Sequence, residues 1–313
     1  MQSEPEHGDI TTDLDQELAD EEILDRRTDE LSQRVYEELS HRERVLGNLY
    51  PFELGSEYGK WVLRRRVASE PEIRAAHGCY MCCLLITAMH SELLPLPSSH
   101  SLFTQSAKIM QIESYLTAAE ILGGSAYWFG FPRPDNTGML AAIQKLVTTM
   151  GLGHAPDERP PGLPPHANDG TVDIVAWRPF RDGQPTAVVA YGQVASGRNW
   201  ETKPIRAYIT GNFLAWFIRP PSQQHVELLF IPFLQHHKLQ ESRTQDFRSL
   251  ARDEAHVRSM NFGVVIDRLR ITELMAASKV NGRYEPNEYL DHEATAQAWM
   301  QEALTYASGS NPA

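Results

Sequence analysis

The segments GTVDIVAW (residues 170–177) and AVVAYGQVASGRNWETK (residues 187–203) decide how this chain is interpreted. Both contain runs of strand-forming apolar residues, and the intervening RPFRDGQPT has the composition of a turn. The sequence therefore predicts two antiparallel strands joined by a hairpin. A single carboxylate, Asp173, interrupts the first strand, and Gln193 ends the apolar part of the second.

The carboxylate of Asp173 needs a physical explanation. A buried, unpaired charge is costly, so Asp173 requires a metal ion, a basic partner or a position at the end of its strand. Antiparallel pairing places Asp173 and Gln193 close together, at the strand ends remote from the turn. With the backbone carbonyl of Val194 they would form an oxygen-rich pocket suited to Mg²⁺. Each residue taken singly also fits a structural role, since Asp173 could pair with Arg178 and Gln193 could cap its strand.

Helical periodicity extends outward from this hairpin in both directions. Helices are expected at 13–46, 54–95, 102–122, 138–150, 239–274 (interrupted near Asn261) and 293–306. A short aromatic strand or loop is expected at 125–134, a helical turn at 207–217 and a strand at 226–233. The pattern predicts an α/β (or α+β) fold in which helices flank a small central mixed sheet. We expect an acidic arm with a helical N-terminal region at 1–100, an α/β core at 101–235 and a helical C-terminal segment at 236–313.

Composition narrows the class of protein. The 313 residues are 42% hydrophobic and 22% charged, as in an ordinary globular chain. No apolar run is long enough for a membrane span, and the acidic N-terminus lacks the pattern of a secretory signal. The three cysteines all lie in HGCYMCC, which favours the reducing cytoplasm. A zinc site at His77, Cys79 and Cys82 is rejected because no second pair of ligands follows at suitable spacing.

The charge of the chain is concentrated in its N-terminal arm. Residues 1–54 hold 16 acidic residues and 5 Arg, a net charge of −11, whereas the whole chain carries −12. The remainder is therefore nearly neutral, and charge neither supports nor excludes a nucleic-acid partner. The helix expected at 13–46 is either a solvated surface helix or a helix that awaits a partner. Motifs for nucleotide hydrolysis and for the common serine chemistry are missing from the sequence.

The order of a glutamate-bearing helix, a Gly-x-x-Asp strand and a strand that ends in Gln resembles the PD-(D/E)xK nuclease superfamily. In particular it resembles the Mrr-like restriction endonuclease branch, in which glutamine replaces the usual acid. The resemblance covers about residues 105–205. It implies a restriction-endonuclease-like core in which Glu113 (with Glu120 as the second choice), Asp173 and Gln193 hold Mg²⁺ or Mn²⁺.

The resemblance further implies a metal-dependent endonuclease that cleaves DNA, in a bacterial defence or restriction system. Such systems also suggest a helicase or ATPase as a partner protein. The position of the family's catalytic lysine is occupied by Ala195. Lys203 is then the best candidate for that catalytic role and Arg198 for phosphate contact, with Trp200 buried so that the segment folds back over the site. The alternative is a catalytically inactive nuclease-fold module that binds a protein partner or nucleic acid.

Overall fold

The computed structural model describes residues 10–58, 60–164, 167–235, 247–283 and 286–309; within them the side chains of 10–25, 247–252, 254–255 and 286–290 are not described. The chain forms two compact units. The first comprises Met1–Gly47 and Phe52–Arg66, and the second comprises Asn48–Pro51 and Val67–Ala313. This division differs from the three ranges expected from the sequence.

The first unit contains one long helix and one hairpin. Helix α1 (Ile10–Leu46) covers the helix expected at 13–46. Strands β1 (Phe52–Glu57) and β2 (Lys60–Arg65) pair antiparallel, with Leu54 opposite Leu63. The expectation that a helix begins at residue 54 is therefore wrong: Phe52 and Leu54, and Trp61 and Leu63, recur at every second residue on one face of a hairpin.

A five-stranded mixed sheet lies at the centre of the second unit, in the order β3-β4-β5-β6-β7. Strands β3 (Ser125–Trp128), β4 (Ile174–Pro179) and β5 (Ala187–Val194) are antiparallel neighbours. Strands β6 (Val226–Phe230) and β7 (Val264–Ile266) continue the sheet parallel to β5. The expected hairpin is thus confirmed, and the fold is α/β with a central mixed sheet flanked by helices.

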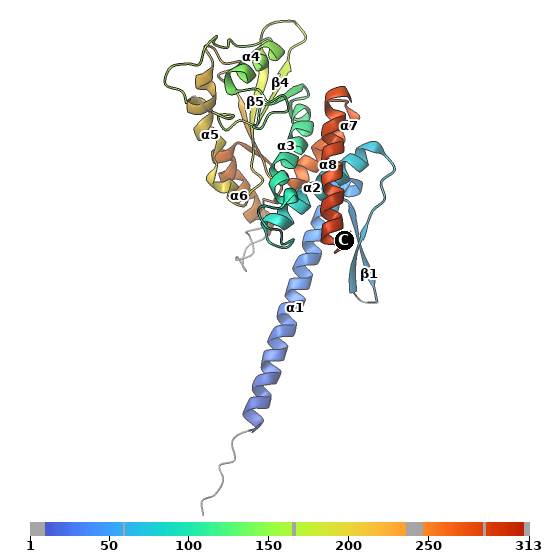
Figure 1. Ribbon diagram of the computed structural model, residues 1–313. Helices are drawn as coiled ribbons and strands as arrows, with labels where there is room; N and C mark the ends of the chain where they lie inside the picture. The colour runs from blue at the N-terminus through green and yellow to red at the C-terminus, as the bar shows by residue number, and fades with distance from the viewer. Residues whose placement is uncertain (1–9, 59, 165–166, 236–246, 284–285, 310–313) are drawn as a thin grey trace, which may run out of the picture. The chain divides into compact units, whose positions relative to one another are not determined.

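Two groups of helices cover the two faces of the sheet (Figure 1). Helices α2 (Pro71–His90), α3 (Ser101–Leu122), α7 (Arg268–Val280) and α8 (Pro286–Ala307) pack on one another, and α3 runs along β3, β4 and β5. The other group comprises α4 (Met139–Met150), α5 (Ile205–Tyr208), a π-helical turn (Ile209–Phe213), a 3-10 turn (Leu214–Trp216) and α6 (Phe247–Phe262). Helix α3 ends at Gly123, whose φ of 64° is the left-handed cap that the sequence suggested.

The apolar core follows the alternation of side chains along the strands. Val175, Trp177, Val189 and Tyr191 point to one face and pack with α4 and the π-helical turn. Farther along the sheet, Leu229 and Val265 belong to a second cluster with Ala195, Trp200 and Phe262. The ends of β4 and β5 that carry Asp173 and Gln193 therefore lie beside a packed interior rather than in a free loop.

The C-terminal third differs from expectation at one strand. Residues 239–246 of the helix expected at 239–274 lie outside the described residues. In the described part, α6 and α7 are separated by the three-residue strand β7, which follows Gly263. The helix expected at 293–306 is confirmed within α8. None of the helices in the described part of the chain combines the length and apolar character that a membrane span requires.

Candidate functional site

Asp173 and Gln193 lie at the ends of neighbouring strands. Ile174 of β4 pairs with Gly192 of β5, and the backbone N–H of Asp173 donates a hydrogen bond of 2.8 Å to the carbonyl of Gly192. This bond is one residue out of the β4–β5 register, so Asp173 and Ile174 both lie opposite Gly192, as in a β-bulge. Asp173 and Gln193 therefore lie at neighbouring strand ends, as expected from the sequence, while the carboxylate of Asp173 is directed to Val194 and to α3.

Hydrogen bonds from two elements fix the carboxylate of Asp173. Its Oδ1 accepts a bond of 2.9 Å from the side-chain amide of Gln111 on α3, and its Oδ2 accepts one of 2.7 Å from the backbone N–H of Val194 on β5. The backbone carbonyl of Asp173 accepts further bonds from the N–H groups of Phe129 and Gly130, at 2.8 and 2.7 Å. The side chain is only 8% exposed, so this small acid joins a helix, a strand and the loop after β3.

Gly130 is required by this arrangement. A Cβ atom at residue 130 would lie 2.6 Å from Oδ1 of Asp173 and 2.7 Å from the amide nitrogen of Gln111. Both distances are far shorter than a van der Waals contact, and the neighbouring atoms are themselves held by hydrogen bonds. The loop after β3 thus passes so close to the carboxylate that a side chain has no room.

The electrostatics at Asp173 would favour a bound cation. The pKa of Asp173 is raised from its ordinary value of 3.8 to about 7, chiefly by burial and also by the negative charge of Asp169, against the opposing effects of the Val194 N–H, Gln111 and Lys203. Asp169 lies in the preceding loop, where it accepts hydrogen bonds from the N–H groups of Thr171 and Phe131 at 2.9 and 3.4 Å. These two acids repel each other, and the positive charges of Arg133 near Asp169 and of Lys203 offset part of that repulsion, as a bound cation would.

Gln193 supplies an oxygen atom whose bonding is incomplete. The residue is 9% exposed, and its Oε1 is buried without a hydrogen-bond partner among the described residues. A buried carbonyl oxygen normally has a partner, because desolvation without one costs about 1–3 kcal/mol. Amide and carboxylate oxygens are the ligands that Mg²⁺ or Mn²⁺ prefers. By the chemistry of their donor atoms, Asp173, Gln193 and Asp169 therefore fit a hard divalent cation.

Trp200, in the segment after β5, is buried as the sequence suggested, and it packs against α6. A 3-10 turn, Trp200–Thr202, buries the indole, whose ring lies 5.5 Å from that of Phe262. The guanidinium of Arg258 lies 5.0 Å from the centre of the Trp200 ring and also binds Glu201 at 3.0 Å. This anchoring fixes the start of the segment that carries Lys203.

Lys203 and Arg198 are both exposed, on either side of the buried Trp200. The positive charge of Lys203 lowers the pKa of Asp173, but no ion pair or hydrogen bond joins these two described side chains. Ala195, in contrast, is buried in the apolar cluster beside β6 and β7. Position 195 is therefore part of the core, and the influence of Lys203 on Asp173 is a longer-range charge effect.

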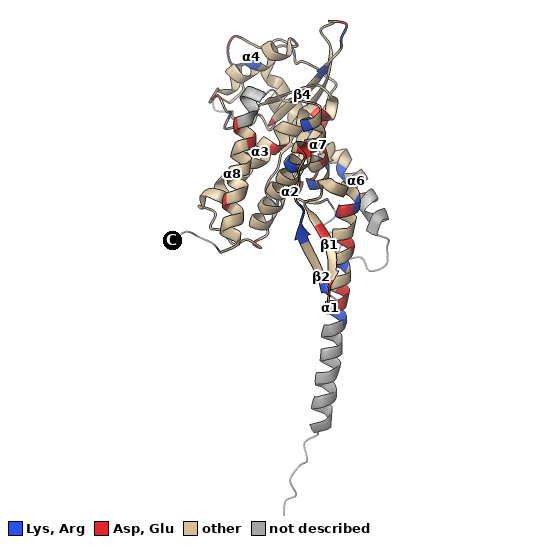
Figure 2. Cartoon of the chain, turned by 90° about the vertical axis from the view of Figure 1, so that its right-hand side faces the viewer, with Lys and Arg blue, Asp and Glu red and all other residues tan. Residues whose placement is uncertain are grey.

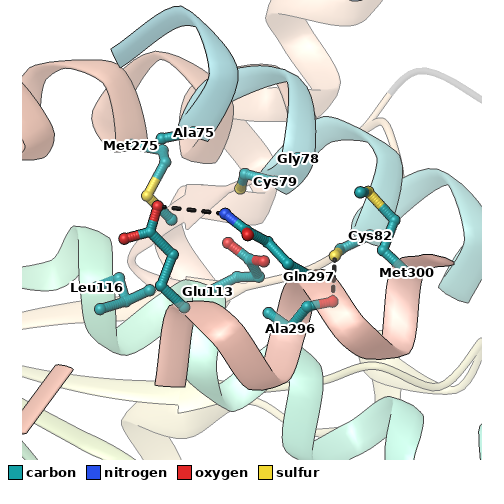
Figure 3. A pocket seen from close by; sticks show the side chains of 11 residues that line it. Ala75, Gly78, Cys79, Cys82, Glu113, Leu116, Met275, Ala296, Gln297 and Met300 are labelled. Carbon is teal, nitrogen blue, oxygen red and sulfur yellow. Dashed lines mark hydrogen bonds between the residues drawn. The ribbon is translucent and has the colours of Figure 1, made fainter. Parts of the chain in front are cut away.

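The structure does not bring the predicted helix glutamates to Asp173. Glu113 points into a cavity of about 20 Å³ among the helices, lined also by Cys79, Cys82, Met275 and Gln297 (Figure 3). Burial raises the pKa of Glu113 to about 7, and hydrogen bonds with the two thiols oppose that rise. Gln111, two positions earlier and about 200° around the helix, faces Asp173 instead.

Glu120, the second choice, binds elsewhere as well. Its two oxygens accept hydrogen bonds from the side chains of Asn281 and Arg283, at 2.8 and 3.0 Å. The side of α3 that faces the strand ends is therefore the one that carries Gln111, and not the sides that carry Glu113 and Glu120. Gln111, Gly130 and Asp169 were not anticipated, although Asp169 lies in the sequence NDGTVD, four residues before Asp173.

Comparison with known proteins adds no assignment: no family model, no curated protein and no solved structure matches this chain. Within the described residues, no group of three or more His, Cys, Asp or Glu side chains has a geometry that could hold a metal ion. The candidate ligand set at Asp173 thus comprises two carboxylates and one amide.

Proposed function

We propose that this chain is a metal-dependent nuclease of the PD-(D/E)xK type that hydrolyses phosphodiester bonds of DNA. The observation that carries the proposal is the pair formed by Asp173 and the unpartnered amide oxygen of Gln193 at adjacent strand ends. The chain order of helix, Asp strand and Gln strand also follows the pattern that the resemblance implies. Mg²⁺ or Mn²⁺ would be held by Asp173, Gln193 and Asp169.

Different residues of the chain would have different roles in this reaction. A divalent ion in such a site lowers the pKa of a bound water and offsets the charge of the scissile phosphate. Gln111 and Val194 orient the carboxylate of Asp173 through their hydrogen bonds. Lys203, whose positive charge lowers the pKa of Asp173, would stabilise the negative charge that develops on the phosphate. Arg198 is exposed and would bind the DNA backbone.

The cellular setting follows from the resemblance. We infer a cytoplasmic protein of a bacterial restriction or defence system, with DNA as its substrate and a helicase or ATPase as its partner. A gene for such a motor protein beside the gene for this chain would support that inference.

A cleavage assay tests the proposed activity. The full chain is incubated with duplex DNA, single-stranded DNA or RNA in the presence of Mg²⁺ or Mn²⁺, and the products are separated by size. DNA should be cut in a metal-dependent way, and Asp173→Asn should abolish cutting because the carboxylate is lost. Asp182→Asn is the matched control, since Asp182 lies in the turn between β4 and β5, at the opposite ends of the strands. A chain that cuts none of these substrates would rule out the active nuclease.

A second candidate function rests on a different observation. Ala195 is buried in the core, and neither Glu113 nor Glu120 reaches Asp173, so the site has fewer charged groups than the family pattern provides. The same structure would serve as an inactive nuclease-fold module that binds a protein partner or nucleic acid. DNA binding by the wild-type chain without cleavage, unchanged in Asp173→Asn, would favour this module.

A further inference from the structure

The loop after β3 contains a buried cation, Arg133. The residue is 2% exposed, and its guanidinium carbon lies 4.5 Å from the centre of the Phe129 ring. One terminal nitrogen donates a hydrogen bond of 2.9 Å to the carbonyl of Thr137 in the same loop, and the other donates one of 2.5 Å to the carbonyl of Asn168. The Nε of Arg133 is buried without a hydrogen-bond partner among the described residues. A buried charge with an unpaired donor is a costly means of joining two loops.

The bond to Asn168 holds the start of a strained turn that carries Asp169. The N–H of Val172 donates a hydrogen bond of 3.2 Å to the carbonyl of Asp169, which closes the turn. The two central residues of the turn, Gly170 and Thr171, have φ angles of 62° and 73°. Glycine adopts such angles readily, whereas a β-branched threonine does so rarely. A conformation of this kind persists only where the surrounding contacts hold it.

The loop after β3 supplies two of the contacts that hold this turn. The N–H of Phe131 donates a hydrogen bond of 3.4 Å to Oδ2 of Asp169, and Arg133 binds the carbonyl of the residue before it. On another side, a Cβ atom added at Gly170 would lie 3.1 Å from the carbonyl oxygen of Asn212 in the π-helical turn. The turn is therefore held between two elements, and Arg133 is the charged side chain among these contacts.

The charge of Arg133 also acts on Asp169. Burial lowers the pKa of Arg133, and the negative charge of Asp169 opposes this shift more than that of Asp135 does. Asp135 has a cation of its own, because Lys145, the basic residue of α4, binds it at 2.7 Å (Figure 2). Arg133 and Asp169, both described side chains, share no hydrogen bond or ion pair. Arg133 therefore acts on Asp169 through the Asn168 carbonyl and through its charge.

We propose that Arg133 is a positioning residue of the candidate cation site: it holds the turn at 168–172 so that the carboxylate of Asp169 joins Asp173 at a bound Mg²⁺ or Mn²⁺. The inference rests on the proposed function, because it assigns Arg133 to the same metal site. Without Arg133 the strained turn can relax, and the ion would lose one of its carboxylate ligands. Loss of a residue that holds a ligand in this way typically lowers metal affinity about 10–100-fold.

Calorimetry with Mn²⁺ tests the role of Arg133 in the full chain and does not depend on cleavage. Arg133→Lys keeps the positive charge, but a lysine cannot bind two carbonyls in the planar geometry of a guanidinium. The variant should bind Mn²⁺ about tenfold more weakly than wild type. Arg133→Gln, which leaves no buried charge, is a second variant with the same expectation, and circular dichroism checks the fold of both. Arg159→Lys is the matched control, since the exposed Arg159 binds the carbonyl of Leu163 in its own loop and its substitution should leave the affinity unchanged.

A double substitution shows whether Arg133 acts through Asp169. Asp169→Asn alone should weaken Mn²⁺ binding at least as much as Arg133→Lys does, because it removes a carboxylate ligand. In the Asp169→Asn background, Arg133→Lys should cause no further loss of affinity. A general effect of Arg133 on the fold would instead add to the effect of Asp169→Asn.

Two kinds of result would contradict these assignments differently. A wild-type chain that binds no Mn²⁺, or whose binding is unchanged by Asp173→Asn, would overturn the metal site and with it both the proposed function and the role of Arg133. Binding that requires Asp173 but is unaffected by the Arg133 variants would overturn the role of Arg133 alone. The same conclusion would follow if Arg133→Lys weakened binding equally in the presence and absence of the Asp169 carboxylate.

Discussion

Asp173 illustrates at the scale of single residues how one acid can organise the junction of several elements. Its carboxylate accepts hydrogen bonds from Gln111 and Val194, and its carbonyl accepts two more from the loop after β3. These bonds offset part of the cost of burying a charged group at a strand end. The same bonds fix the direction of the carboxylate, which a site for a cation or a phosphate needs.

The close approach of the backbone at Gly130 leads to a prediction. Gly130→Ala should reduce the free energy of unfolding by about 1–3 kcal/mol, because the new methyl group displaces the Gln111 amide or the Asp173 carboxylate. Chemical denaturation measures the change. Gly211→Ala is the control, since a Cβ there has no neighbour within 4 Å. Equal stabilities of the two variants would show that the site tolerates an added methyl group.

Substitutions of Lys203 and Arg198 are expected to affect different properties, the rate of cleavage and the binding of DNA respectively. If the nuclease proposal holds, Lys203→Ala should lower the rate of DNA cleavage by about a hundredfold or more, because it removes a charge that acts on the transition state. Metal affinity, measured by calorimetry with Mn²⁺, should stay within severalfold of wild type. Arg198→Ala should instead raise KM and reduce the salt dependence of DNA binding. An unchanged rate in Lys203→Ala would contradict the catalytic role of this lysine.

Helix α3 shows at the scale of elements why the strand part of the site was predictable and the helix part was not. The alternation of side chains and the hairpin turn were enough to place Asp173 and Gln193 at neighbouring strand ends. Helix α3 is buried on several sides, with Ile109, Met110 and Ile112 all inaccessible to solvent. Such a helix gives no polar stripe from which its sheet-facing side can be identified, so Gln111 and Glu113 could not be distinguished from the sequence.

The strands that the sequence did not reveal are short or lie close to a strong helical pattern. Strand β7 has three residues between two helices, and too few residues alternate there to distinguish it from a helix break. Strands β1 and β2 contain Leu54, Trp61 and Leu63, whose alternation was obscured by the strong helical pattern that begins at residue 71. Long helices and the β4–β5 hairpin, in contrast, extend far enough for their periods to be recognised.

The buried carboxyl group of Glu113 should make the stability of the folded chain depend on pH. Its pKa in the folded chain is about 7, above the ordinary value of 4.5, because the carboxyl is buried between α2, α3 and α8. The folded chain therefore binds more protons than the unfolded chain between about pH 4.5 and 7. This stabilisation is complete below pH 4.5 and is lost as the pH rises through 7. Asp173 contributes to the pH dependence in the same direction.

Glu113→Gln should remove the contribution of this group. The variant should gain stability relative to wild type by about 3 kcal/mol between pH 4.5 and pH 8, since its amide carries no charge at either pH. Urea denaturation at the two pH values measures the gain. Glu302→Gln, at an exposed position of α8, is the control and should show no such gain. A pH-independent difference for Glu113→Gln would mean that the carboxyl is not the titrating group.

The two compact units of the whole molecule do not follow the order of the chain. Residues Asn48–Pro51 belong to the second unit although they lie between α1 and the β1–β2 hairpin of the first. Within this short segment, Tyr50 is buried, and its ring meets that of Tyr80 on α2 edge-on at 5.2 Å. The carbonyl of Asn48 lies 2.9 Å from Nε2 of His77, also on α2. The second unit therefore depends on residues that a truncation before Val67 would remove.

Tyr50→Ala tests this division of the chain. The substitution should lower the free energy of unfolding of the second unit by about 3–5 kcal/mol, because it leaves a cavity the size of an aromatic ring against α2. The circular dichroism signal during chemical denaturation follows the loss, since most helices belong to that unit. Tyr58→Ala is the control, because Tyr58 is fully exposed beside β1 and should leave the transition unchanged. Equal transitions in the two variants would mean that residues 48–51 are dispensable, so that the stable unit would begin at Val67.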